Sequence, residues 1–151
     1  MDIYILLYLF LIAGPLSTLI HEAGHLVGAS LLKADQITLS FGSGRKMYSI
    51  NMNKVHIFFQ PSLFISGATM SERNRPYNSV EVAFISLCGP LCNILFFTIF
   101  TVLYQYFTND YLFLLIFLNG WFAIINIIPF KVKEKESDGY IVMKQLFKKK
   151  F

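Results

Sequence analysis

Three long stretches without a charged residue constrain the fold of this chain more than any other feature of its sequence. They are residues 3–20, 82–107 and 111–130, which are 18, 26 and 20 residues long. A helix needs about 20 apolar residues to cross the hydrocarbon core of a bilayer, so each stretch is long enough. Hydrophobic residues make up 55% of the chain and charged residues only 15%, which argues against an ordinary soluble domain. The sequence therefore predicts a multi-pass α-helical membrane protein.

Alternating apolar and polar residues between the first and second stretches predict a small β-sheet. Ile37, Leu39 and Phe41 alternate with polar residues, and the same period of two recurs as far as Phe59. Such alternation is typical of strands. We therefore expect three transmembrane helices with a small antiparallel sheet between the first two. The expected elements of this single domain are a helix at 3–32, a β-region at 37–70, helices at 80–107 and 111–130, and a loop with a basic interfacial helix at 131–151.

The basic residues predict how the chain is oriented in the membrane. All 13 Lys and Arg residues lie either between the first and second stretches or after the third. By the positive-inside rule, segments rich in Lys and Arg stay on the cytoplasmic side. We therefore expect the N-terminus outside, and the sheet and the C-terminus on the cytoplasmic side. The expected location is the cell membrane.

Ionisable side chains interrupt the first predicted helix, which carries the sequence HEAGH at positions 21–25. Such groups are costly inside a membrane and are functional candidates for that reason. His21 and His25 share one helix face, so their imidazoles could bind one zinc ion, with Glu22 as the general base of a zinc hydrolase. The alternative is a polar cluster that joins helices by hydrogen bonds. Gly24 and Gly28 would let another helix approach this face closely.

A zinc site with two histidines and a water needs a third protein ligand, and the sequence offers three candidates. Asp138 follows the third helix, Glu81 begins the second, and His56 lies in the strand region. Taken alone, Asp138 is typical of a helix N-cap, Glu81 of a charge at the membrane interface, and His56 of a solvent-facing strand residue. The residue pattern by itself leaves all three open.

Polar residues also occur in the other two predicted helices. The second helix carries Asn93 shortly after Gly89 and Pro90, and the third carries Asn119 and Asn126 on one face. An asparagine at this depth either makes an interhelical hydrogen bond or faces the metal. If Asn93 faces the metal, it could orient a substrate or stabilise an oxyanion.

Taken in order, these motifs resemble the site-2 protease family of intramembrane zinc metalloproteases. The matching features are HEAGH in the first helix, Gly89-Pro90 with Asn93 in the second, Asn126 to Pro129 at the end of the third, and Asp138-Gly139 after it. The resemblance runs from about residue 15 to about residue 145 and is to a minimal three-helix core. One departure is the separation of 12 positions between Asn126 and Asp138, which exceeds the usual spacing because a charged insert at 131–136 intervenes.

The resemblance implies that His21, His25 and Asp138 bind one zinc ion per chain and that Glu22 is the catalytic base. It also implies that Asn93 lines the cleft and contacts the substrate. The implied activity is that of an endopeptidase in regulated intramembrane proteolysis, which hydrolyses a peptide bond in or near a transmembrane segment.

The partners expected from this resemblance are the lipid bilayer and a membrane protein or membrane-associated peptide as substrate, and not nucleic acid. Two alternatives remain. One is a catalytically inactive binding or regulatory protein with the same fold, and the other is a helix-packing subunit of a transporter. Zinc content separates the enzyme and the inactive protein from the packing subunit. Dependence of the biological effect on Glu22 separates the enzyme from the inactive protein.

Overall fold

The computed structural model describes residues 2–44, 48–60 and 62–147. Within this part of the chain, three helical segments are long and apolar enough to cross a bilayer, namely Ile3–Leu31, Ser79–Tyr104 and Asp110–Ile127. The first comprises α1 (Ile3–Tyr8), a π-helical turn η1 (Leu9–Ala13) and α2 (Gly14–Leu31), and the other two are α3 and α4. The number and the approximate positions of the predicted membrane helices are thereby confirmed.

The helix ends are set by local chemistry. The side chain of Asn78 accepts hydrogen bonds from the first turn of α3, while Glu81 bonds back to the Asn78 backbone, which forms a capping box. α4 ends at Ile127, before the uncharged stretch ends, because the next residue but one is Pro129. A residue that precedes proline avoids the helical region, and Ile128 is extended accordingly.

A four-stranded sheet lies between α2 and α3 in the sequence. Its strands are β1 (Gln36–Ser43), β2 (Tyr48–Met52), β3 (Val55–Phe59) and β4 (Ser62–Glu72), and their order is β2-β3-β1-β4. β2 and β3 form an antiparallel hairpin and β4 pairs antiparallel with β1, but β1 and β3 are parallel. The sheet is therefore mixed, and the prediction of a purely antiparallel sheet is wrong.

The position of β3 explains the parallel pairing. β3 carries Val55, Ile57 and Phe59 and is half-buried along its whole length, whereas β2 is mostly exposed. The more apolar strand takes the inner place beside β1 because that place removes more apolar surface from water. The chain reverses direction between β1 and β2, and again between β2 and β3. The inner β3 therefore runs in the same direction as β1.

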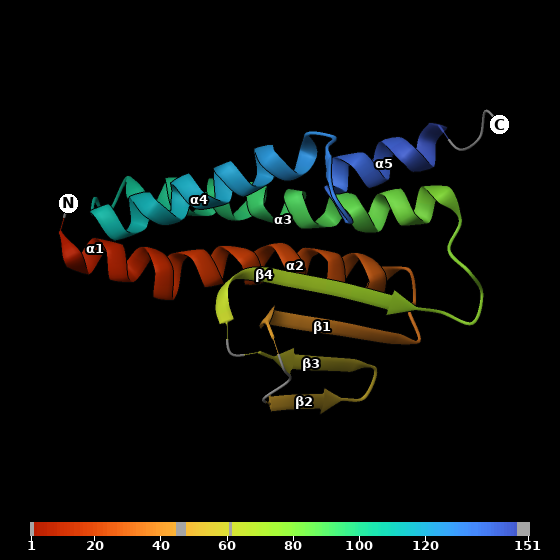
Figure 1. The fold of residues 1–151 in the computed structure, drawn as a ribbon. Coiled ribbons are helices and arrows are strands. Elements are labelled where there is room, and N and C mark those ends of the chain that lie inside the picture. The colour runs from red at the N-terminus through yellow and green to blue at the C-terminus, as the bar shows by residue number, and fades with distance from the viewer. Residues whose placement is uncertain (1, 45–47, 61, 148–151) are drawn as a thin grey trace.

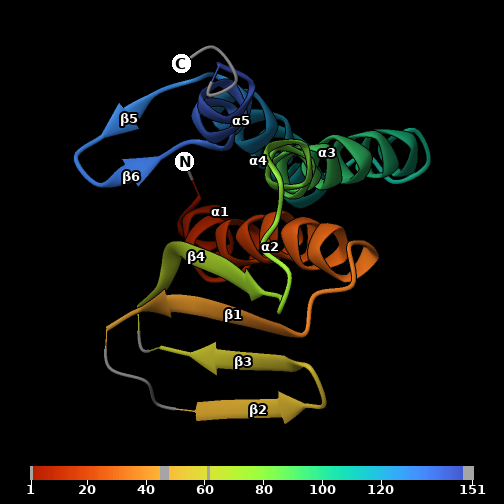
Figure 2. The same ribbon diagram turned by 90° about the vertical axis from the view of Figure 1, so that its right-hand side faces the viewer.

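The elements form layers in which α2 lies between the sheet and the pair of helices α3 and α4 (Figures 1 and 2). The apolar face of β1, with Ile37, Leu39 and Phe41, is buried, and Ile37 packs into a small core with Ala29 of α2. On its other side α2 packs closely against α3. The approach is so close that a Cβ atom at Gly24 would lie 2.7 Å from Cβ of Cys92. This contact confirms the close helix approach predicted from the glycines.

After α4 the chain makes a short hairpin of β5 (Lys131–Val132) and β6 (Lys135–Glu136), and then the last helix, α5 (Asp138–Phe147). α5 lies against the first part of α3, at the end of the bundle opposite the N-terminus (Figure 1). The predicted C-terminal helix is thereby found, while its last predicted residues, 148–151, lie outside the described part of the chain.

Candidate metal centre

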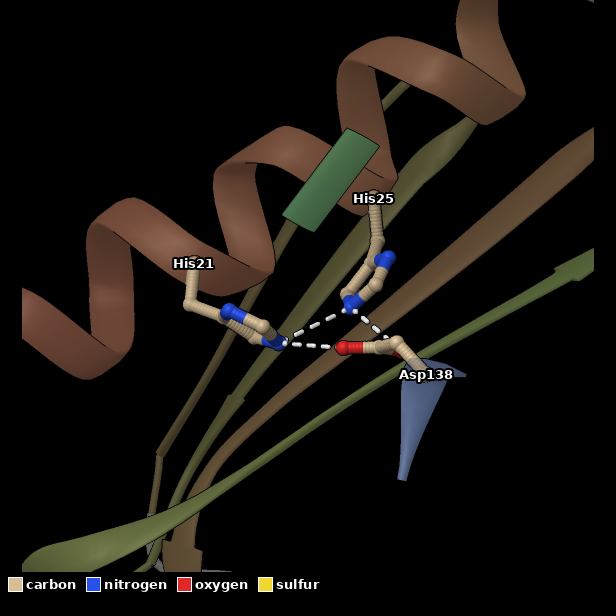
Figure 3. A group of neighbouring side chains, drawn as sticks. All are labelled: His21, His25 and Asp138. Atoms are coloured by element: carbon tan, nitrogen blue, oxygen red, sulfur yellow. Dashed lines mark hydrogen bonds and ion pairs between the residues drawn. The ribbon is translucent and has the colours of Figure 1, made fainter. Parts of the chain in front are cut away.

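Side chains from two helices at opposite ends of the chain meet in the middle of the molecule. His21 and His25 project from α2 toward Asp138 at the start of α5 (Figure 3). The Nε2 atom of His21 is 3.0 Å from Oδ2 of Asp138, and Nε2 of His25 is 3.4 Å from Oδ1. The two Nε2 atoms are 3.1 Å apart, and none of the three side chains is more than 12% exposed. This compact group could hold a metal ion.

The hairpin β5–β6 is what returns Asp138 to the two imidazoles. Its ends are joined at Ser137, whose backbone N–H donates to the carbonyl of Phe130, while its hydroxyl donates to the carbonyl of Ile128 at 2.7 Å. α5 then lies directly on the end of α4, and a Cβ atom at Gly139 would overlap the carbonyl of Ile127. The long spacing between Asn126 and Asp138 is thus taken up by a small ordered element.

Charges hold the same hairpin together. Glu136 accepts hydrogen bonds from Lys131 and from Lys144 of α5, each at 3.0 Å. These bonds keep the pKa of the Glu136 carboxyl below its ordinary value, and the bond from Lys131 has the largest effect. The carboxylate is therefore ionised at neutral pH and links the hairpin to α5.

The other two candidate ligands lie elsewhere. Nδ1 of His56 on β3 is 2.9 Å from Oδ1 of Asn51 on the neighbouring strand β2. Glu81 binds Arg73 at 2.8 Å, and Arg73 also donates to the carbonyl of Leu32, so this pair joins the end of β4 to α2 and α3. Of the three candidates, the structure brings only Asp138 to the histidines.

Hydrogen bonds on the far side of each imidazole assign its protons. Nδ1 of His25 lies 2.9 Å from the carbonyl oxygen of Ile85, which can only accept, so Nδ1 carries the proton. Nδ1 of His21 lies 2.7 Å from Oδ1 of Asn93, which also accepts. Each ring thus carries a proton on Nδ1 and turns its Nε2 toward Asp138, where an unprotonated Nε2 offers a lone pair.

These assignments bring together a set of electron-pair donors that can bind a cation, either a proton on an imidazole Nε2 or a metal ion. Two imidazole nitrogens and the carboxylate of Asp138 face one another within 4.8 Å and are largely shielded from solvent. Such a set without a positive charge between its members would be repulsive. Two histidines and one carboxylate form a known ligand set for zinc in hydrolytic enzymes, with a fourth position left for water or substrate.

Glu22 lies beside this group without joining it. Its side chain is buried between α2 and β4, where the hydroxyl of Thr69 donates to Oε2 at 2.7 Å. The position next to His21, on a helix turn that faces the sheet, matches the role of general base predicted from the motif. That role itself stays a prediction.

Two cavities meet beside His21 and Glu22. One of about 250 Å³ lies between α2 and α4. The other, of about 400 Å³, is bounded by β4, the first part of α3, β6 and α5. A peptide or water that enters either cavity therefore reaches the same group of residues. The residues that line both are His21, Glu22, Gly67 and Asn126.

Asn93 lies directly behind His21. Its side chain is fully buried behind His21, with Oδ1 bound to the imidazole and Nδ2 bound to Ser17 and Asn119. All its hydrogen-bonding atoms are thus engaged within the helix bundle. The geometry supports a positioning role for Asn93, and a direct contact with substrate stays a prediction.

The sequence interpretation did not include Thr69 and Ser17. Thr69 reaches Glu22 only because of the register and placement of β4, and no short motif carries that information. Ser17 did offer a signal, because it is a polar residue four positions before His21 on the same helix face.

Comparison with known proteins does not supply a relative: no family model matches the chain, and no curated protein matches it. The resemblance to site-2 proteases therefore rests on the order of the motifs, and the chemistry must be argued from the site.

Proposed function

We propose that this chain is an intramembrane zinc-dependent endopeptidase of the site-2 protease type. Its substrate is a membrane-embedded or membrane-associated peptide, cut in or near a transmembrane segment. The observation that carries the proposal is that His21, His25 and Asp138 converge beside Glu22, next to cavities lined in part by helices long and apolar enough to cross a bilayer. A buried constellation of this kind inside membrane helices is costly to maintain without a function.

Each residue has a role in hydrolysis. Zinc held by His21, His25 and Asp138 would supply Lewis acidity, which lowers the pKa of a bound water to about 7. In this proposal the Glu22 carboxylate would take the proton of the attacking water and later give it to the leaving amine. The hydroxyl of Thr69 holds one carboxylate oxygen of Glu22 in place, which leaves the other oxygen to accept the proton.

The sheet supplies a place for the substrate. A transmembrane helix hides its peptide bonds in internal hydrogen bonds, so the cut segment must first become extended. β4 is an edge strand, paired with β1 on one side only, and its residues 67–70 line the larger cavity. An extended segment that pairs with this edge would pass directly over Glu22.

The inactive-protein alternative was based on the long spacing before Asp138 and on the small size of the core, and the return of Asp138 through the hairpin answers the first of these. For the orientation we keep the prediction from the positive-inside rule, with the sheet and the C-terminus cytoplasmic in the cell membrane. The end of α2, the start of α3 and α5 lie together at one end of the bundle, which agrees with a common side for the basic segments (Figure 1).

Metal content is the first test. Detergent-purified wild type should contain about one zinc per polypeptide by elemental analysis, and Asp138→Ala should contain much less because only two ligands remain. His56→Ala is the matched control, since this histidine lies on the sheet away from the site, and it should keep the wild-type content. A well-folded wild type without bound metal would overturn the proposal.

Dependence on the base is the second test. Glu22→Gln keeps the shape of the side chain but cannot take the proton, so it should retain zinc and lose cleavage. The measurement is quantitative mass spectrometry of new peptide termini in membranes that contain either wild type or Glu22→Gln.

Termini that appear with wild type and vanish with Glu22→Gln identify the substrate. Equal termini in both would exclude Glu22 as the base. Zinc binding without any Glu22-dependent terminus would favour the inactive binding protein.

A further inference from the structure

A chain of buried polar side chains runs from the proposed zinc ligand His21 into the interior of the helix bundle. Asn93 of α3 binds His21, Asn119 of α4 binds Asn93, and Ser17 of α2 binds both asparagines. We propose that Asn119 and Ser17 are positioning residues that fix the amide of Asn93 and thereby aim the imidazole of His21 at the metal. This inference rests on the metal site of the proposed function and not on the peptidase activity.

The contacts in this chain are short and shielded. Nδ2 of Asn93 donates to Oδ1 of Asn119 at 2.9 Å and to the carbonyl of Ser17 at 3.2 Å. Nδ2 of Asn119 donates to Oγ of Ser17 at 3.1 Å and to the carbonyl of Leu115 at 2.8 Å. Ser17, Asn93 and Asn119 are each 0% exposed, so water cannot replace a lost partner from outside.

The direction of every hydrogen bond in this chain is determined. Two of its acceptors are backbone carbonyls, of Leu115 and Ser17, and these cannot donate. Each asparagine amide must therefore turn its NH₂ group toward a carbonyl, which sets the side chain one way round. Asn93 is left with its oxygen toward His21, and the imidazole must donate from Nδ1. A reversed amide at Asn119 would face Asn93 with a second donor and break this order.

The two histidines differ in what holds them. His25 is fixed by the backbone carbonyl of Ile85, which no side-chain substitution removes. His21 depends on side chains from two other helices. The network therefore controls one ligand and leaves His25 and Asp138 in place, so its loss should weaken metal binding rather than abolish it.

The test measures metal binding by the purified full-length protein in detergent, with zinc alone as the probe. Affinity is read by competition with a chromophoric chelator, and the ligand geometry by the visible absorption spectrum of the Co²⁺ form. Asn119→Leu keeps the approximate volume but removes the amide, and we expect about tenfold weaker zinc binding and an altered Co²⁺ spectrum, as is typical when a residue behind a metal ligand is lost.

Leu115→Ala is the matched control. Leu115 is buried one turn before Asn119 on the same helix, and its truncation loosens the packing while the backbone carbonyl that accepts from Asn119 remains. Its zinc affinity and Co²⁺ spectrum should equal those of the wild type. Should Asn119→Leu fail to fold, Ser17→Ala replaces it, and this variant should show a smaller weakening with the same spectral change.

Wild-type affinity and an unchanged spectrum in Asn119→Leu would overturn the inference and leave the proposed function standing. Equal weakening in Leu115→Ala would also overturn it, because general loosening would then be the cause. A wild type that binds no zinc would remove the site on which both rest. Weak binding in Asn119→Leu alone supports the inference, whether or not a peptidase activity is found.

Discussion

Glu22 is held by the hydroxyl group of Thr69, and no Lys or Arg in the described part of the chain forms an ion pair with it. The Thr69 hydroxyl has a single proton, and its oxygen lies 2.7 Å from the Glu22 carboxylate and 3.2 Å from the Glu22 backbone carbonyl, so the carboxylate is the closer acceptor. A neutral donor orients a carboxylate without forming an ion pair, so the carboxylate remains available to accept a proton. Sequence reasoning identified Glu22 from its motif, but Thr69 depends on strand register, which one sequence does not specify.

Two substitutions at Thr69 separate its hydroxyl from its shape. Thr69→Val leaves a buried carboxylate oxygen without its donor, and we expect cleavage to fall about tenfold, since 1.4 kcal/mol is a factor of ten. Thr69→Ser keeps the hydroxyl and should retain most of the rate. The readout is the rate at which the Glu22-dependent termini appear, with zinc content as the check on the site. A wild-type rate in Thr69→Val would show that the contact is not needed.

At the scale of elements, periodicity predicted which segments become helices and strands, but not how they pair. The long uncharged stretches gave three helices, and period two gave the strands. The antiparallel prediction failed because alternation is a local property, whereas the inner place of β3 depends on competition between β2 and β3 for the side of β1. The sequence showed the residues of the β5–β6 hairpin only as a charged insert at 131–136 between Asn126 and Asp138.

The contact between α5 and α4 predicts an effect of a single methyl group. Gly139→Ala would place a Cβ atom onto the carbonyl of Ile127, so α5 must shift and carry Asp138 away from the histidines. We expect a clear loss of zinc per polypeptide by elemental analysis. Gly120→Ala is the control, because its Cβ atom would meet only the side chain of Phe97, at 3.1 Å. Full zinc content in Gly139→Ala would contradict this account.

At the scale of the whole molecule, the site lies where every layer meets. α2 supplies two imidazoles and Glu22, the sheet supplies Thr69, α3 and α4 supply the asparagines behind His21, and α5 supplies Asp138. The sequence predicted the chemical groups because their types and helical spacing are local. The cavities and the fixed amides could not be predicted, because they follow from how α2, the sheet, α3, α4 and α5 pack together.

The distribution of the ligands also has a consequence for biosynthesis. A chain that emerges from the ribosome presents its two histidines with the first helix and its aspartate only with the last. Until α5 has been made and has packed on α3, the histidines lack their anionic partner and Glu22 has no metal beside it. If the chain is the peptidase proposed above, it would pass through the insertion machinery, among many unfolded membrane segments, before its site is complete.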